Sequence, residues 1–69
     1  MLNFILTTLT CYSSIWQVYT EENALLGLLG WNYVLEEWKY LPCSSLGEKY
    51  TKQSIMFELS LFNSRNEEQ

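Results

Sequence analysis

The sequence predicts a small α+β domain of order β-β-α-β, in which one amphipathic helix packs on a three-stranded antiparallel sheet. Three observations predict it: an uncharged, β-prone stretch over residues 1–20, apolar residues at helical spacing in the middle of the chain, and an alternating pattern near the end. A chain of 69 residues has room for a single domain. We assign residues 1–62 to this domain and residues 63–69 to a polar, flexible C-terminal tail.

The first two strands are expected at residues 2–10 and 15–19, which are rich in Ile, Phe, Thr, Val and aromatic residues. The polar residues 11–14 separate them, so the pair indicates a hairpin. Apolar side chains occur on both sides of the first strand. This pattern is typical of a central strand, or of a strand whose second face meets a partner.

A helix is expected over residues 21–40, capped by Thr20 and ended by Pro42. Apolar residues recur there at spacings of 4, 3, 4 and 3, which is the helical period; they are Ala24, Leu28, Trp31, Leu35 and Trp38. An alternative is that a short helix ends at Gly30 and that residues 31–40 form a strand. Gly27 lies beside the apolar stripe, where a glycine would permit close approach to the sheet.

The last strand is expected at residues 53–62, after a loop at 42–49. Alternation places Ile55, Phe57, Leu59 and Leu61 on one face. With one helix on three strands, the second face of the sheet would be open.

Composition and charge bear on the kind of function. The chain has 4 basic and 8 acidic residues, a formal charge of −4, and neither His nor Asp. The usual catalytic triads and His-ligated zinc sites need those missing residue types, so we expect no enzyme, no cofactor and no metal site. The basic residues are too few and too scattered along the chain for direct binding to nucleic acid. An acidic body is instead attracted to basic protein surfaces.

The cysteines and the uncharged N-terminal stretch bear on location. Cys11 and Cys43 are expected as buried free thiols in a reducing cytoplasm, although the sequence leaves a disulfide open. Residues 1–20 contain eight polar side chains, so we expect strands there and no membrane segment. The protein is therefore expected to be cytoplasmic.

The outer side of the expected helix is the first candidate binding surface. Leucines and tyrosines alternate there with carboxylates, a composition that suits hydrophobic anchors with an acidic rim. The partner-binding candidates are Leu26, Leu29, Tyr33, Tyr40, Glu22, Glu36 and Glu37. Exposed apolar residues are also common without function, and the segment 42–52 could cover some of them. A second candidate is the outer sheet face, with Met56, Glu58 and Phe62 and also Ile5, Leu9 and Tyr19, or a free edge strand.

These features predict a non-catalytic acidic protein-interaction module, an inhibitor or adaptor that docks on a larger basic, nucleic-acid-handling protein and occludes it. In size and charge alone, the chain is similar to small acidic phage-encoded inhibitors, including anti-CRISPR and anti-restriction proteins. The alternative is a small structural subunit that self-assembles, for example as a homodimer, or fills a gap in a larger complex.

Overall fold

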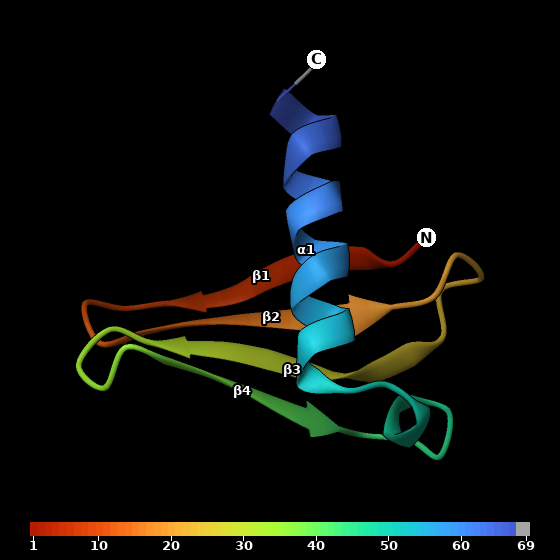
Figure 1. The fold of residues 1–69 in the computed structure, drawn as a ribbon, viewed down its shortest axis with the longest axis horizontal. Helices are drawn as coiled ribbons and strands as arrows, with labels where there is room; N and C mark the ends of the chain where they lie inside the picture. Colours follow the sequence, from red (N-terminus) through yellow and green to blue (C-terminus); the bar gives the residue numbers. More distant parts are fainter. Residues whose placement is uncertain (68–69) are drawn as a thin grey trace.

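The computed structural model describes residues 1–67, with side chains through Arg65, and confirms the α+β class. One helix lies across one face of an antiparallel sheet whose strands follow the chain order β1-β2-β3-β4 (Figure 1). The elements are β1 (Asn3–Leu9), β2 (Ser13–Tyr19), β3 (Leu25–Asn32), β4 (Glu37–Pro42), the short 3₁₀ helix η1 (Gly47–Lys49) and α1 (Lys52–Glu67). Within residues 1–67, no helix combines the length and apolar character needed to cross a bilayer.

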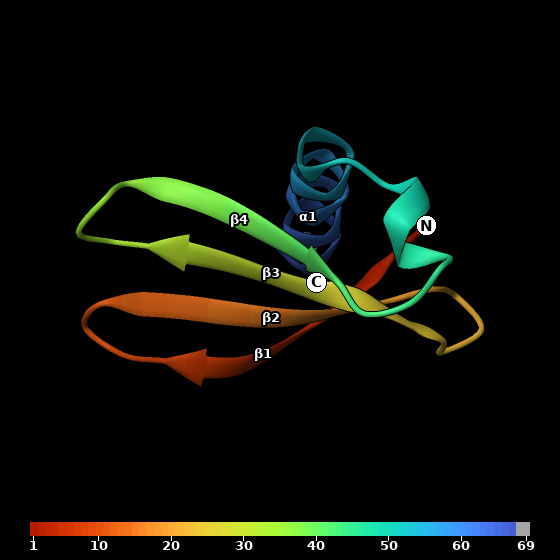
Figure 2. The same cartoon turned by 90° about the horizontal axis from the view of Figure 1, so that it is seen from below.

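The first hairpin is confirmed, since the two strands pair antiparallel. β1 lies within the expected range 2–10, and β2 begins two residues before the expected range 15–19. The sheet, however, has four strands instead of three, and both later assignments are wrong: residues 21–40 form no helix, and residues 53–62 form no strand. The helix covers only one face, and the other face of the sheet is bare (Figure 2).

The expected helix at 21–40 is a hairpin because its apparent N-cap closes a turn. Thr20 Oγ1 accepts the Ala24 N–H at 3.1 Å, and the Thr20 N–H donates to the Ala24 carbonyl at 2.9 Å. Asn23 takes the left-handed backbone conformation, with φ of 68°, which Asn tolerates better than most residues. A Thr that caps helices can also hold a tight turn in this way.

A second polar residue, Asn32, ends β3. Its side-chain oxygen accepts the N–H groups of Val34 and Leu35, both at 2.9 Å, which turns the chain back into β4. The turn is completed by Glu36, whose φ is 53°.

A β-bulge explains why β3 has helix-like spacing. Tyr19 pairs with Leu25 but Val18 pairs with Gly27, so Leu26 is an extra residue in the strand. Leu26 and Leu29 therefore both reach the core, although they are three positions apart and would point to opposite faces of a regular strand.

The last element is a helix because its N-terminus is capped and its apolar residues also fit a helical stripe. The Ser54 N–H donates to Thr51 Oγ1 at 3.1 Å, and the Thr51 N–H donates to Ser54 Oγ at 3.0 Å. Ile55 and Leu59, one turn apart, are buried, whereas Phe57 is 63% exposed. Residues 63–67, expected as part of the tail, continue α1; residues 68–69 lie outside the described residues.

The core lies between α1 and the sheet. Its buried apolar residues are Leu2, Phe4, Val18, Leu26, Leu29, Ile55 and Leu59. Phe62 of α1 packs on Phe4 of β1 with ring centroids 5.6 Å apart. The first and last elements of the chain therefore close the core together.

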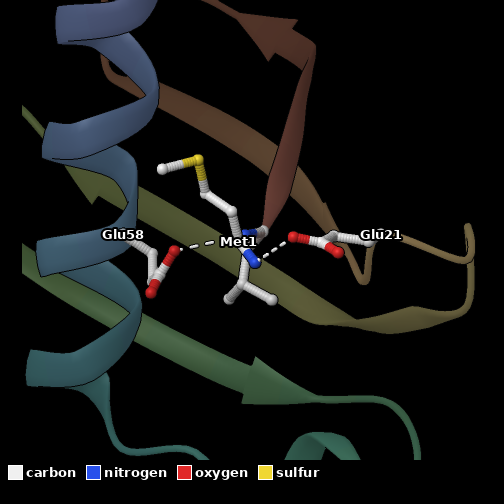
Figure 3. A network of polar contacts seen from close by, with 4 residues as sticks. Met1, Glu21 and Glu58 are labelled. Atoms are coloured by element: carbon white, nitrogen blue, oxygen red, sulfur yellow. Dashed lines mark hydrogen bonds and ion pairs between the residues drawn. The ribbon is translucent and has the colours of Figure 1, made fainter.

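Polar contacts strengthen this closure at the N-terminus. The Met1 amino group forms an ion pair with Glu21, and the Leu2 N–H donates to Glu58 of α1 at 3.2 Å (Figure 3). Hydrogen bonding with Glu21 raises the pKa of the Met1 amine, and the same contact lowers the pKa of the Glu21 carboxyl.

Candidate docking surfaces

Two of the sequence-predicted anchors cannot meet a partner, because Leu26 and Leu29 are both 0% exposed. They lie on β3, which is paired on both sides and covered by α1. The expectation that they lie on the outer side of a helix was therefore wrong.

Tyr40, a third predicted anchor, holds the fold together. Its ring packs against the core, and its hydroxyl donates to the Gly47 carbonyl at 2.7 Å. Burial raises the pKa of the Tyr40 hydroxyl. This contact fastens η1 to β4, so the hydroxyl is engaged within the chain.

The four other candidates separate into two places. Glu22 lies in the turn between β2 and β3, at the opposite end of the sheet from the turn between β3 and β4. Tyr33, Glu36 and Glu37 lie together at the latter turn, and both carboxylates are exposed. The structure therefore brings together three of the seven predicted residues.

Around these three residues lies a larger exposed apolar cluster, which we call the tip surface. It consists of Leu9, Tyr12, Tyr33, Val34 and Leu35, whose exposed fractions range from 45 to 69%. The two turns that carry it lie side by side at one end of the sheet (Figure 1). The Tyr33 N–H donates to the Tyr12 carbonyl at 2.8 Å, which joins one turn to the other.

A row of aromatic rings supports the tip surface from the side of the sheet that faces α1. Ring centroids are 6.3 Å apart for Tyr33 and Trp31, 5.1 Å for Trp31 and Trp38, and 5.7 Å for Trp38 and Trp16. Aromatic contacts of this kind are favourable and restrict side-chain motion. Tyr33 is therefore held in place within the chain itself.

The bare face of the sheet, which we call the open face, is a second apolar surface. One row in register crosses all four strands and contains Ile5, Gln17, Leu28 and Leu41. Ile15, Tyr19 and Leu25 belong to the same face. A hollow of about 520 Å³ lies at the β4 edge, where Leu28 and Leu41 of this face and also Tyr40 and Lys52 from the α1 side line it.

The second surface expected from the sequence is only partly present. Met56 and Phe62 pack against the core from α1, so they do not belong to an outer sheet face. Glu58 is also on α1, where it binds Leu2. Ile5 and Tyr19 do lie on the open face, and Leu9 belongs to the tip surface.

Sequence reasoning missed Tyr12, Val34 and Leu35 as surface residues, and it expected Leu9 on the outer sheet face instead of at the tip. Leu35 was assigned to the buried stripe of the expected helix, and Val34 precedes it in that helix. The available signal was Asn32, because an Asn before two apolar residues can form a turn that leaves both exposed.

The described residues offer few groups for chemistry. Cys11 and Cys43 are free and exposed, not buried as expected, because one lies in the β1–β2 turn and the other follows β4. These positions are at opposite ends of the sheet. Among the described residues, no group of three His, Cys, Asp or Glu side chains could hold a metal ion.

The chain was compared with protein-family models, with curated proteins and with solved structures, and no significant match was found in any of the three comparisons.

Proposed function

We propose that the protein is a non-catalytic protein-interaction module that docks through its tip surface on a basic surface of a larger protein. The observation that carries the proposal is the tip surface itself: five exposed apolar side chains on or next to two hydrogen-bonded turns, beside Glu36 and Glu37. Single exposed apolar residues are ordinary, but a contiguous cluster is typical of interaction sites.

The position of the tip surface supports this proposal. Val34 and Leu35 lie in the turn beyond β3, and neither is among the residues that form or flank the core. Their side chains therefore contribute little to the stability of the fold. Association with a partner that covered them would be favoured by the free energy of burying their apolar area. Tyr33 adds an aromatic ring with a polar hydroxyl, a residue type enriched at interface centres.

The charges nearby favour a basic partner. Glu36 and Glu37 flank the cluster, and the whole chain carries a formal charge of −4. Carboxylates at the rim of an interface steer association and fix orientation more than they add affinity. Occlusion of a nucleic-acid-handling protein is the form of this function that the charge favours, since such proteins have basic grooves.

A matched pair of variants tests the proposal. Leu35 on the tip surface and Leu41 on the open face are 63% and 62% exposed. Replacing either with Ser should leave the fold intact, because exposed side chains rarely change stability by more than about 0.5 kcal/mol. The immobilised chain should retain a basic protein from the native host, and Leu35→Ser should weaken its binding about tenfold or more, a loss above about 1.4 kcal/mol.

The control and the salt dependence complete the test. Leu41→Ser should bind as the unaltered chain does, and binding should weaken between about 0.05 and 0.5 M salt. Equal binding by Leu35→Ser, or loss of binding only in Leu41→Ser, would show that the tip surface is not the docking site.

A further inference from the structure

The β1 strand lies at an edge of the sheet but has the sequence of a central strand. Residues Asn3–Leu9 contain no charged side chain and no proline. Ile5 is 53% exposed on the open face, and Leu6 is 46% exposed on the face that carries α1. Natural edge strands usually carry charges or proline that prevent pairing with another chain.

The opposite edge shows that protection. In β4, Glu37 and Lys39 are exposed and Pro42 removes a backbone donor. The one irregularity of β1 is the bulge at Thr7, whose hydroxyl donates to the Ile15 carbonyl at 3.1 Å. On either side of the bulge, β1 pairs regularly with β2. Because β1 is an edge strand, the backbone N–H and C=O groups that point away from β2 are unpaired.

We propose that β1 pairs antiparallel with β1 of a second copy of this chain, which joins two four-stranded sheets into one sheet of eight strands. A two-fold axis near the middle of β1 would bring Leu6 close to Leu6 of the second copy, and uncharged side chains would face each other along the seam. Such an interface uses the same patch on both copies.

The β1 edge places no charge in the way of a second copy, although each chain is acidic. The strand itself carries no charge, and the nearby Glu21 and Glu58 are engaged by the Met1 amine and the Leu2 N–H. Within the β1 seam itself, two chains of charge −4 can therefore meet without placing like charges opposite each other.

The helix would add to the interface. The C-terminal end of α1 continues past β1 (Figure 1), and α1 crosses β1 at Phe4, away from the middle of the strand. The two-fold axis would place both helices on the same side of the joined sheet and beside each other. Each helix end would then cover part of the partner's sheet. This contact adds buried area, because a stable dimer interface buries about 1,000 Å² or more and strand pairing alone buries less.

Two charge insertions at opposite edges of the open face provide the test. Ile5→Lys places a charge on β1, and Leu41→Lys places the same charge on β4 at a similarly exposed position. Sedimentation and light scattering of the full chain, from about 1 to 500 µM, should show a mass near twice that of one chain at the upper concentrations. Ile5→Lys should remain monomeric throughout, while Leu41→Lys should dimerise like the unaltered chain.

Any other outcome overturns the proposal and shows which part of it is wrong. A monomer at all concentrations excludes the dimer, a dimer in Ile5→Lys excludes β1, and loss of the dimer in both variants indicates packing through the open face. Leu35→Ser should still dimerise, so failure of this proposal and failure of tip-surface docking are separately visible.

Hydrogen exchange on the unaltered chain keeps the test decisive if Ile5→Lys does not fold. The outward amides of β1 should exchange about tenfold more slowly at high than at low concentration, while the outward amides of β4 should not change. Equal exchange of β1 at both concentrations would exclude the pairing.

Discussion

The side-chain oxygens of Ser14 and Tyr33 lie 2.6 Å apart, and this hydrogen bond ties the first hairpin to the turn that follows β3. Ser14 is 1% exposed and has Trp31 as its cross-strand neighbour. A hydroxyl buried to that degree needs a partner, and Tyr33 supplies it. Tyr33 therefore links the fold and the tip surface in one side chain.

Removing the Tyr33 hydroxyl should destabilise the fold more than removing the Ser14 hydroxyl. Tyr33→Phe leaves the buried Ser14 hydroxyl without its partner and should lower the free energy of unfolding by about 1–3 kcal/mol. Ser14→Ala should lower it by about 1 kcal/mol, because Tyr33 can turn its hydroxyl to water. Urea unfolding of both single variants and of the double variant measures the coupling, and strictly additive losses would contradict a direct bond.

The two glycines of β3 should respond differently to a methyl group. A Cβ at Gly27 would lie 2.4 Å from the Leu41 carbonyl oxygen, whereas the nearest atoms to a Cβ at Gly30 are 3.9 Å away. Gly27→Ala must therefore push β3 and β4 apart and should destabilise the fold by about 2 kcal/mol or more. Gly30→Ala should be neutral or slightly stabilising, and thermal unfolding of the two variants gives the comparison.

Ile55 and Phe57 distinguish the helix at α1 from the strand that the alternation predicted. A strand would place both on one face, but in α1 Ile55 is 0% exposed and Phe57 is 63% exposed. Ile55→Ala should lower the free energy of unfolding by about 2–4 kcal/mol. Phe57→Ala should change it by about 0.5 kcal/mol or less. Similar losses for both variants in chemical denaturation would favour the strand.

The ion pair between the Met1 amine and Glu21 should give a pH-dependent contribution to stability. The folded pKa of Glu21 is lowered from 4.5, so its contribution is present above that pH and is lost as the pH falls below it. The folded pKa of the amine is raised from 8.0, so its contribution is present below that pH and is lost as the pH rises through the raised value.

At pH values between these two, Glu21→Gln should therefore lower the temperature of the unfolding midpoint. When that temperature is plotted against pH, the variant and the unaltered chain should converge under strongly acidic conditions. The effect should be small because both groups are exposed and screened by salt. Glu22→Gln is the control, since Glu22 forms no ion pair with the described residues. A difference for Glu21→Gln that persists unchanged at low pH would point to another cause.

The sequence allowed the first hairpin to be predicted because β-branched and aromatic residues dominate residues 2–19 and a polar break separates them. The second half could not be read from local periodicity. In β3, the bulge at Leu26 gives a strand the three-residue spacing of a helix, and bulges depend on pairing with neighbouring strands. In α1, large apolar residues fill so many positions that periods of 2 and 3.6 both fit, and only burial against Phe4 and Leu29 decides between them.

Of the candidate site, the sequence indicated exposed aromatic and acidic residues but not the turn that carries them. Tyr33, Glu36 and Glu37 were expected on the outer side of a helix over residues 21–40, and they lie together instead at the turn between β3 and β4. Leu26 and Leu29 were misplaced because their exposure depends on which segment covers them. Leu9 and Tyr12 come next to Tyr33 only through strand pairing, which a linear pattern does not contain.

The contact between Phe4 and Phe62 joins β1 to α1, so it can form only after both elements have been synthesised. As the chain leaves the ribosome, all four strands emerge before α1, and neither side of the sheet is then shielded from water. The nascent sheet carries apolar groups on both sides until the final sixteen-residue element arrives to cover one of them. A chain interrupted before Thr51 would expose apolar groups on both sides of its sheet, the kind of surface that makes incompletely folded chains prone to aggregation.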